Sequence, residues 1–409
     1  MTKLRISVKN TSAEGGTALT PFFAGFHDNS FDLYDLGAAS SPGLEALAED
    51  GNNDPIAAEL VAADADAQAV NVAGARGPIV AGETTSAIVD VDGRSNGYLS
   101  LASMVLPSND AFVGTAEAVQ LFDAHGRFLG AQTVSFSGDS VRDAGTEVNT
   151  ERDAAFINQT APDTGITENG VVTVHPGFNG SLGNPGGEQI ILGGTNAFGE
   201  VVDPVAGDFT QPGAQIADIH INTVVEREGT DGRDIIVGRG DDDIVTAGDG
   251  NDIVFGRDGW DDIDGGAGRD LLFGGRGDDI IDGGAGRDKI FGGRGDDQIL
   301  GGDGNDWITG GKGDDAIAGG AGNDDLRGGR GDDTFLFSAG DGHDVIGDFN
   351  RRGDDRLALS VEGIDSFEDV LAVANESRKG VTLDFADAGS VFLRRTDIDD
   401  LTADDFLFG

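Results

Sequence analysis

Cysteine is absent from the 409 residues, and basic side chains are few, since 27 Lys and Arg stand against 74 Asp and Glu. Without cysteine the chain has no disulfide, no thiolate metal site and no thiol nucleophile. The net charge of −47 argues against nucleic acid as a partner, because a polyanion repels a phosphate backbone. No apolar run approaches the length needed to cross a membrane, so we expect no membrane-spanning segment.

Glycine, in contrast, is abundant, and much of it belongs to a repeat. Twelve nonapeptides run without a gap from Gly229 to Leu336, each with an aliphatic residue or phenylalanine at its eighth position. The fourth position is glycine in every unit except at Asp241. Every unit has aspartate at its sixth position: Asp234, Asp243, Asp252, Asp261, Asp270, Asp279, Asp288, Asp297, Asp306, Asp315, Asp324 and Asp333.

Each nonapeptide combines six residues of turn chemistry with three of strand. Glycine supplies the positive φ angles of a tight loop, and a three-residue strand points only its middle side chain inward. The eighth-position residues therefore form a thin core. Residues 265–282 and 283–300 match at 14 of 18 positions, so the true repeat is two units, one circuit of a two-sheet coil. Loops of odd and even units then stack on opposite edges of a parallel β-roll.

Stacked loops bring carboxylates and glycine carbonyls together, which suits a hard divalent cation with six to eight oxygen ligands. The segment resembles the RTX family, secreted proteins whose parallel β-roll folds around calcium. The resemblance implies Ca²⁺ between neighbouring loops, roughly ten ions in all. Residues 229–336 carry 26 Asp, no Glu and 11 Lys or Arg, a net charge of −15, so we expect the repeat to be disordered without calcium.

The C-terminal segment 337–409 is expected to form a small α+β cap on the roll. GDGHDVIGDF, with Asp344, has the pattern of a last irregular turn, SFEDVLAVA (366–374) that of a capped helix, and VTLDF with SVFLRR that of a hairpin. A second helix is predicted from Thr396 to Asp405.

The N-terminus lacks the apolar stretch of a secretory signal, so export by another route is expected. RTX proteins leave through a one-step type I secretion channel that reads an uncleaved C-terminal signal, and the ending DDFLFG resembles one. The alternative is a plain folded cap with no role in export.

The outer faces of the roll differ in polarity. The seventh and ninth positions of odd units are mostly apolar, as at Ile253, Phe255 and Phe273, whereas even units carry Asp262, Asp264 and other polar residues there. A sheet that is apolar outside as well as inside is usually covered. Packing against the rest of the chain and contact with a partner or a second copy both remain open.

Residues 1–228 lack the repeat and contain strand-like runs separated by turns, which predicts an antiparallel β-sandwich and makes the whole chain all-β. The runs are LRISV, SAIVDV, YLSLASMVL, AEAVQLFD, VVTVHPGF, QIILGG and AQIADIHINTV. One helix is predicted from Ser41 to Glu49, where SPGLEALAE supplies a cap, an early proline and glutamates in order.

Four strings in this region, FAGFHDNSFDLYDLG, SPGLEALAEDG, SMVLPSNDAFVG and DAGTE, resemble the spondin N-terminal domain and occur in that family's order. The resemblance extends from Leu4 to Val224 and implies an extracellular adhesion or matrix module that binds one calcium ion. Its site residues fall on Asp110, Asp143 and Glu147. Glutamate stands where the family more often has aspartate, and Ala111 stands where an aromatic usually precedes Phe112. The alternative is that these carboxylates only solvate loops.

Catalytic patterns are weak or missing. No histidine is followed by glutamate, so the H-E-x-x-H motif of zinc proteases is absent. GRSNG at 93–97 fits the G-x-S-x-G pattern, but a strand pattern follows Ser95 where a nucleophile elbow needs a helix. His27 with Asp28, and His175, are interpreted as structural residues. Arg-Gly-Asp triplets, as at Arg276, fall in loops that already require glycine and aspartate, so we interpret them as coincidence.

Taken together, the sequence predicts a secreted, extracellular calcium-binding protein that is not an enzyme. We assign 1–228 to the spondin-like sandwich, 229–336 to the roll, and 337–409 to the cap and secretion signal. Expected partners are calcium, the type I secretion apparatus, and a cell-surface, glycan or matrix ligand of the sandwich. A self-assembling surface-layer or biofilm protein is the first alternative, and a secreted hydrolase is the second.

Overall fold

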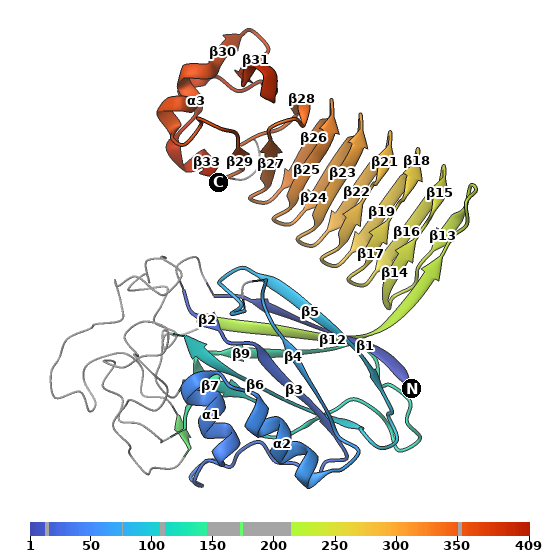
Figure 1. Cartoon of the computed structure of the whole chain (residues 1–409), viewed down its shortest axis with the longest axis vertical. Coiled ribbons are helices and arrows are strands. Elements are labelled where there is room, and N and C mark those ends of the chain that lie inside the picture. Colours follow the sequence, from blue (N-terminus) through green and yellow to red (C-terminus); the bar gives the residue numbers. More distant parts are fainter. Residues whose placement is uncertain (13–15, 76, 107–110, 145–171, 175–213, 351–353) are drawn as a thin grey trace, which may run out of the picture. The chain divides into compact units, whose positions relative to one another are not determined.

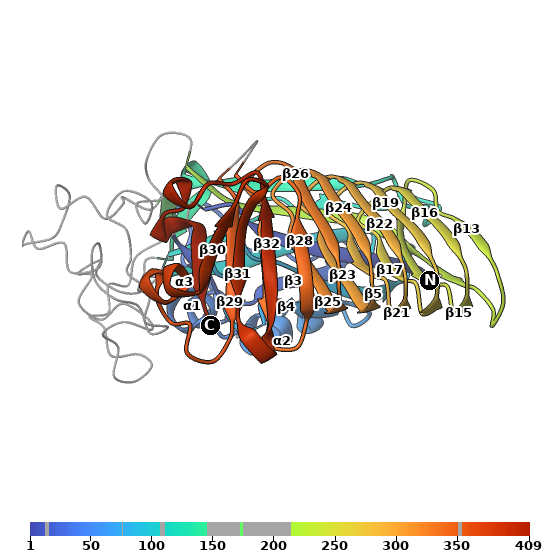
Figure 2. The ribbon, with the colours of Figure 1, turned by 90° about the horizontal axis from the view of Figure 1, so that it is seen from above.

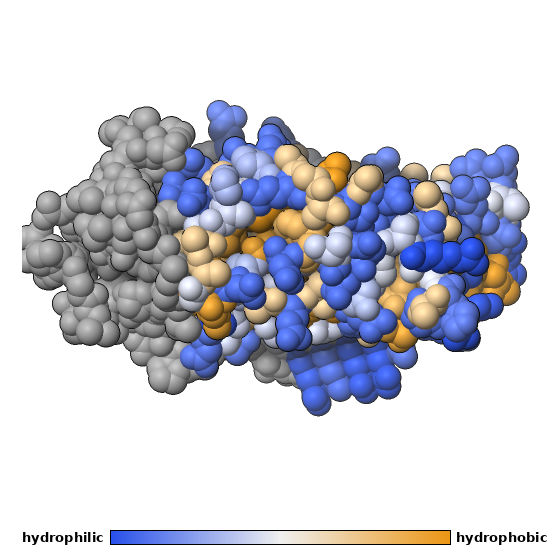
Figure 3. All heavy atoms as spheres, turned by 90° about the horizontal axis from the view of Figure 1, so that it is seen from below, coloured by the Kyte–Doolittle hydropathy of each residue, from blue (hydrophilic) through white to orange (hydrophobic). Residues whose placement is uncertain are grey.

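The computed structural model describes the chain apart from residues 13–15, 76, 107–110, 145–171, 175–213 and 351–353 (Figure 1). It divides into two compact units, Met1–Thr223 and Val224–Gly409. In the described part, no helix is long and apolar enough to cross a membrane. Figure 3 shows one face of the molecule, where hydrophilic side chains predominate and apolar residues gather in patches between them, as the acidic composition predicts.

The N-terminal unit contains two antiparallel sheets, so the predicted antiparallel sheet is confirmed. Pairing in the first sheet follows the order β5 (Thr84–Val91), β1 (Thr2–Asn10), β12 (Gln215–Glu228) and β9 (Gln132–Ser137). The second has the order β11 (Thr173–Val174), β10 (Val141–Asp143), β7 (Ala111–Gly114), β6 (Tyr98–Leu106), β3 (Phe22–His27) and β4 (Gln68–Val72). β2 (Ala18–Leu19) and β8 (Val119–Gln120) also pair with β6.

Alternation along the strands builds the core between these sheets. Leu4, Ile6 and Val8 of β1 and Phe22 and Phe26 of β3 point into one buried cluster. The opposite face of the second sheet, which includes Phe23 and Phe112 among other residues, packs with the apolar residues of two helices. Both faces of the second sheet are therefore buried, which explains the almost continuous apolar run of β6.

The predicted helix 41–49 is confirmed as α1 (Pro42–Asp50). The Ser41 hydroxyl accepts a hydrogen bond from the backbone N–H of Leu44 at 3.1 Å, and Gly51 ends the helix at φ 64°. The sequence analysis missed α2 (Asp54–Ala63), which begins with Pro55 in its first turn. Figure 1 shows α1 and α2 side by side next to β6 and β7.

The second unit begins as a parallel β-roll with a turn of 18 residues, and the predicted solenoid is confirmed. The odd sheet, from odd nonapeptides, contains β13 (Ile235–Val237), β16 (Ile253–Asp258), β19 (Leu271–Arg276), β22 (Lys289–Arg294), β24 (Trp307–Lys312) and β26 (Asp325–Arg330). The even sheet contains β14 (Asp242–Thr246), β17 (Asp262–Asp264), β20 (Ile280–Asp282), β23 (Gln298–Gly304), β25 (Ala316–Gly322) and β27 (Thr334–Ser338). The short strands β15 (Asp249–Gly250), β18 (Ala267–Gly268) and β21 (Ala285–Gly286) pair within the loops.

Pairing partners lie one turn apart, as Ile253 with Leu271 and Ile281 with Ile299 show. The eighth-position side chains are buried in a single column between the two sheets, from Val245 through Ile290 to Phe335. Glycine is required where loops stack, because a Cβ on Gly268, at φ +152°, would lie 1.5 Å from the carbonyl oxygen of Gly250. We call the loops of odd units the odd edge and those of even units the even edge.

The cap continues both sheets of the roll (Figure 2). β28 (Gly342–Ile346) extends the odd sheet and then pairs with β32 (Gly389–Arg394). β29 (Arg356–Ser360) extends the even sheet and then pairs with β33 (Phe406–Phe408). The column of apolar residues therefore runs from the roll into the cap without a break.

In the cap, the first predicted helix and the predicted hairpin are confirmed. The helix at 366–374 is α3 (Phe367–Val373), followed by β30 (Ala374–Ser377), and the hairpin pairs β31 (Gly380–Asp384) with β32. The helix predicted at 396–405 is wrong, because two 3₁₀ turns, Ile398–Asp400 and Ala403–Asp405, occupy this segment. The carboxylate of Asp405 accepts from the Thr402 backbone N–H at 2.6 Å, which closes a single turn instead of starting a helix.

Candidate metal centre: two carboxylate ladders

The sixth-position aspartates form two ladders, one along each edge of the roll. The backbone N–H of each aspartate donates to Oδ1 of the aspartate one turn later, as from Asp279 to Asp297 at 2.9 Å and from Asp288 to Asp306 at 2.8 Å. The contacts repeat from Asp234 to Asp344 on the odd edge and from Asp243 to Asp355 on the even edge. Eleven of the twelve predicted aspartates are buried, and Asp234 is half-buried.

The second oxygen of these carboxylates has no hydrogen-bond partner in the interior of the ladders. Among the described residues, Oδ2 is buried without such a partner in a run of sixth-position aspartates that includes Asp252, Asp270, Asp279, Asp288, Asp297, Asp306, Asp315 and Asp324. A buried ionised oxygen without compensation costs several kcal/mol, on the order of the desolvation penalty of a charge in a protein interior. Such a regular row of uncompensated oxygens indicates a missing positive charge at each position.

Glycines hold a small space open beside most of these oxygens. A Cβ placed on Gly274 would lie 2.2 Å from Oδ2 of Asp279, and one on Gly292 would lie 2.3 Å from Oδ2 of Asp297. The same relation joins Gly310 to Asp315, at 2.2 Å. Only glycine fits here, and its position leaves a carboxylate oxygen facing a loop that has main-chain carbonyls and no side chain.

No group of three or more His, Cys, Asp or Glu side chains converges on one point in the part of the chain that the structure describes. Each loop instead supplies single carboxylates together with backbone oxygens. An all-oxygen donor set suits calcium or magnesium and does not suit metals that prefer thiolate or imidazole. The residues present therefore fit a hard divalent cation whose remaining ligands are carbonyl oxygens and water.

Burial shifts the protonation of the ladder carboxyls. Desolvation raises the pKa of Asp279 to about 9 and that of Asp315 to about 8, and neighbouring carboxylates add to both shifts. On the odd edge, desolvation raises the pKa of Asp288 to about 7 and that of Asp306 to about 6. Nearby Arg269 and Arg287 oppose these two shifts. Without a cation, folding therefore disfavours the charged form of these groups near neutral pH.

Protein donors satisfy the carboxylates at the ladder ends. Arg227 Nε donates to Oδ1 of Asp243 at 2.6 Å, and the Thr230 backbone N–H donates to Oδ2 of Asp234 at 2.7 Å. At the other end, the Asn350 backbone N–H donates to Oδ2 of Asp355 at 2.6 Å. The need for a cation is therefore concentrated in the interior of each ladder.

Two ladder residues were not recognised as such in the sequence. Asp344 follows Asp324 by 20 residues and Asp355 follows Asp333 by 22, so both lie outside the 18-residue spacing. The only signal was the aspartate of the irregular last turn at Asp344.

The three carboxylates predicted in the N-terminal unit are only partly described. Asp143 ends β10, and its backbone pairs with that of Ala111, the residue after Asp110 in the sequence. Asp110 and Glu147 lie outside the described residues. The pairing brings the backbones of the two predicted motifs side by side.

Two of the catalytic patterns weighed in the sequence, at Ser95 and His27, lack catalytic geometry, and His175 lies outside the described residues. Ser95 lies in a turn whose backbone N–H donates to Asp92, and strand β6 follows it, not a helix. His27 Nδ1 accepts from the Asn29 backbone N–H at 3.1 Å, so in the neutral ring Nε2 carries the proton and donates to Ser100 Oγ at 3.0 Å. This tautomer leaves the imidazole without a lone pair to activate Ser100, and burial lowers its pKa.

Comparison with known proteins adds two family matches. The Spondin_N family matches residues 14–168, and the RTX calcium-binding nonapeptide repeat matches five segments between residues 228 and 335, of which the first four overlap. Neither family is a catalytic one. No curated protein matches the chain.

Among solved structures, the chain is similar to the extracellular lipase LipA from Serratia marcescens, at 22% identity and a TM-score of 0.27. The match covers 46% of this chain and 42% of the lipase chain, so this chain spans less than half of that protein. A similarity this weak carries no argument about activity.

Proposed function

Because the chain carries a spondin N-terminal domain and RTX calcium-binding repeats, we propose that it is an extracellular calcium-dependent binding protein. Calcium folds its roll outside the cell, and its sandwich contacts a surface or matrix ligand. The observation that carries this proposal is the double row of buried Oδ2 atoms without hydrogen-bond partners. The domain assignment of 1–228, 229–336 and 337–409 is part of the same proposal.

The sixth-position aspartates are proposed to hold the ions. Oδ1 is used by the ladder and fixes the side chain, while Oδ2 faces the glycine loop, as between Asp297 and Gly292. A bound calcium ion supplies the positive charge that the buried carboxylates lack. Protein donors already satisfy carboxylate oxygens at Asp243 and Asp355. We therefore propose that the ions lie between the interior aspartates of each ladder.

Coupling between ion binding and folding explains how such a chain is exported. In the low calcium of the cytoplasm the acidic repeat stays unfolded and passes through a type I channel, and the millimolar calcium outside then folds it. The C-terminal residues act as the export signal in this proposal. In the folded state, Phe406–Phe408 pair with β29. In this proposal, the segment that the channel recognises before export therefore becomes part of a sheet after folding.

A second calcium site is proposed in the sandwich, formed by Asp110, Asp143 and Glu147. Its support is the pairing of Asp143 with Ala111, which places one predicted motif beside the other. To test it, Asp143→Asn is made in a fragment of residues 1–228 and bound calcium is counted by calorimetry. We expect the variant to bind one ion fewer than the parent fragment. An unchanged count would remove this site and leave the roll unaffected.

The main proposal is tested by calorimetric calcium titration of the full chain, with circular dichroism at each step. We expect uptake of roughly ten ions together with a gain of sheet signal. Sedimentation at the end point distinguishes a monomeric binding protein from a self-assembling surface-layer protein. The titration is done at a pH above the raised aspartate pKa values, and full sheet content there in the presence of chelator, before any calcium is added, would overturn calcium-dependent folding.

A further inference from the structure

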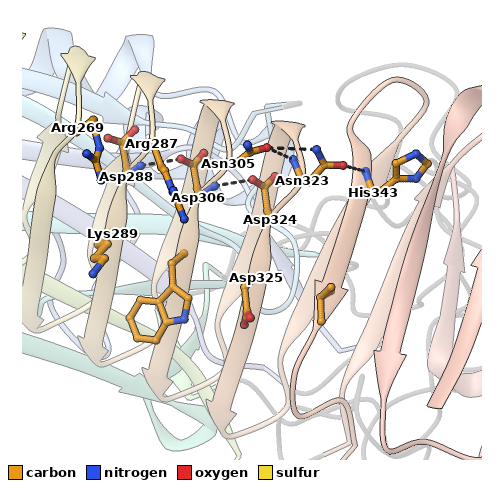
Figure 4. Close-up of a pocket in the computed structure, with 12 residues that line it drawn as sticks. Arg269, Arg287, Asp288, Lys289, Asn305, Asp306, Asn323, Asp324, Asp325 and His343 are labelled. Carbon is orange, nitrogen blue, oxygen red and sulfur yellow. Dashed lines mark hydrogen bonds between the residues drawn. The ribbon is translucent and has the colours of Figure 1, made fainter. Parts of the chain in front are cut away.

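A polar hollow of about 450 Å³ lies along the odd edge of the roll, where the ladder aspartates Asp288, Asp306 and Asp324 form part of its lining (Figure 4). Its cationic residues come from three positions on neighbouring turns: Arg269 before β19, Arg287 before β22, and Lys289 at the start of β22. Trp307, at the start of β24, forms another part of the lining. Its volume lies within the roughly 300–1,000 Å³ of small-molecule sites.

Within the described residues the cations of this hollow form no close ion pair, and Arg269 and Arg287 interact with the ladder carboxylates Asp288 and Asp306 only at longer range. Arg269, Arg287 and Lys289 are exposed, and their side chains form no ion pair or hydrogen bond with any described residue. The hollow's outward-facing carboxylate, Asp325, is already paired with Arg327 at 3.5 Å and Arg394 at 3.6 Å. In a chain with a net charge of −47, three unpaired cations in one hollow form a distinct local feature.

The position of these arginines weakens calcium binding, so the ladder alone does not explain them. They occupy the fifth position of their units, directly before Asp270 and Asp288. At the same position the even edge carries Asp278 and Asp296, which favour a cation. An arginine beside an ion row adds repulsion, which indicates that the side chain has another use.

Trp307 gives the hollow an apolar wall. Its ring centroid lies 4.9 Å from that of Phe291, which continues a stack of Phe255 and Phe273 along the odd sheet, and the Arg327 guanidinium lies 5.5 Å from the indole. A second hollow of about 580 Å³, lined by Arg327 and Arg395 among other residues, also includes Trp307. The two hollows together suit an elongated ligand that has both a negative charge and an apolar face.

Calcium increases the positive charge of the site. The ladder carboxylates Asp288, Asp306 and Asp324 line the same hollow as the three cations, so without calcium their negative charge offsets that of the cations. Ions bound to the ladder neutralise Asp288, Asp306 and Asp324, which leaves the arginines and Lys289 in excess. A negative ligand is therefore attracted only to the calcium-loaded roll.

We propose that this hollow binds an anionic sugar unit of a glycan, through Arg269, Arg287 and Lys289 for the carboxylate or sulfate and Trp307 for the ring. Guanidinium groups match these planar or tetrahedral oxyanions, and an indole face packs on the C–H face of a sugar. The inference rests on calcium folding of the roll and is separate from any ligand of the sandwich.

The test uses the full chain in saturating calcium at low salt, with binding followed by calorimetry. The probes are a hexasaccharide of alternating glucuronate and N-acetylglucosamine, its sulfated analogue, and neutral maltohexaose. We expect one or both acidic probes to bind and maltohexaose not to bind, and their ranking distinguishes carboxylate from sulfate recognition. Arg269→Gln with Arg287→Gln should weaken binding at least about tenfold, and Trp307→Ala should also weaken it.

The matched control is Arg276→Gln with Arg294→Gln, which removes the same charge from the even edge. It should bind the acidic probe as the parent does. Equal losses in both double variants, no binding of either acidic probe, or equal binding of maltohexaose would each overturn the proposal.

Circular dichroism of the same samples separates this inference from the proposed function. If the parent chain gains sheet with calcium and binds no acidic probe, the glycan site fails and calcium folding stands. The Arg269→Gln, Arg287→Gln variant should fold at an equal or lower calcium concentration than the parent, because repulsion beside the ladder is removed. A loss of probe binding in that variant then reports on the site and not on unfolding.

Discussion

Each ladder aspartate uses its two oxygens differently, which explains why no other residue occupies the sixth position. Oδ1 accepts a main-chain hydrogen bond from the previous turn, as from Asp279 to Asp297, and Oδ2 remains buried beside glycine. Asparagine would keep the first contact and lose the charge. Glutamate would place its carboxylate one methylene too far to meet a loop stacked at strand spacing.

The role of the charge on an interior ladder aspartate is tested by Asp297→Asn. The amide oxygen can still accept from the Asp279 N–H, so the backbone register is retained. We expect the variant to bind one calcium ion fewer and to lose about 1–3 kcal/mol of stability in calcium, as for loss of a charged hydrogen-bonding partner. Asp262→Asn, on the outer face of β17, removes the same charge and is the control; an equal effect there would contradict a specific role for Asp297.

At Asp243, the first aspartate of the ladder on the even edge, a protein side chain supplies the positive charge. Arg227 pairs with the fully buried Asp243 at 2.6 Å. Arg227→Gln should destabilise the calcium-loaded roll by about 3 kcal/mol, because loss of one partner leaves a buried charge uncompensated. Thermal unfolding in saturating calcium measures it. Arg276→Gln is the control, since its contact with Asp258 spans 3.7 Å between exposed side chains; comparable destabilisation by both would refute the assignment.

At the scale of the element, each 18-residue turn of the roll is a strand–loop–strand–loop circuit that buries few apolar side chains. One apolar side chain per strand points inward, such as Ile281 or Ile290, and the loops contribute glycine and carboxylates. A turn therefore gains little from the hydrophobic effect and brings buried charge with it. In the proposed function, bound ions supply the stabilisation that apolar burial lacks. The larger Phe335, Phe337 and Phe349 enlarge the core only where the roll meets the cap.

The pH dependence of the metal-free roll follows from the raised pKa values. In the unfolded chain, aspartate has its ordinary pKa of roughly 3.9. Folding raises the pKa of Asp297 to about 7 and that of Asp315 to about 8. Between these values the folded state holds more protons, so its stability is greatest at low pH and falls as pH rises through the folded pKa values.

In chelator we therefore expect sheet signal near pH 4–5, roughly at the unfolded pKa, and its loss between about pH 6 and 8. Circular dichroism across this range measures the change, and added calcium should restore the sheet at the higher pH. A metal-free roll equally structured at pH 5 and pH 8 would show that the buried carboxyls do not control folding.

At the scale of the whole molecule, the two units depend on different driving forces. Met1–Thr223 has a core between two sheets and a second cluster under α1 and α2, which supports folding by burial of apolar surface. In the proposed function, folding of Val224–Gly409 depends on ions, and each ion contributes about 2.7 kcal/mol when free calcium exceeds its Kd a hundredfold. Several ions together exceed the roughly 5–15 kcal/mol that separates folded from unfolded domains.

Chelation should therefore act on one unit only. In excess chelator at pH 7.5, we expect protease to cleave the roll and leave a resistant N-terminal fragment, with one thermal transition remaining. Calcium should restore protection of residues 224–409 and a second transition. Mass spectrometry of the resistant fragments identifies the boundary. Simultaneous loss of both units in chelator would show that they do not fold independently.

Sequence alone determined the features that depend on local spacing. The nonapeptide period predicted the parallel roll, its eighth-position core and the calcium ligands, because one short circuit is repeated with the same residues. Serine, proline and glutamate between residues 41 and 49 predicted α1 for the same local reason. Where spacing varies, prediction failed: the longer steps to Asp344 and Asp355 hid their place in the ladders, α2 was missed, and residues 396–405 form 3₁₀ turns.

Only the tertiary structure decided which polar atoms find partners. The repeat shows an aspartate in every unit, but stacking of turns decides that Oδ1 accepts a hydrogen bond and Oδ2 does not, and that Arg227 donates to Asp243. The hollow with Arg269, Arg287 and Trp307 arises from three successive turns in register. Such contacts join residues 18 or more positions apart, so they depend on how the coil closes and not on any local pattern.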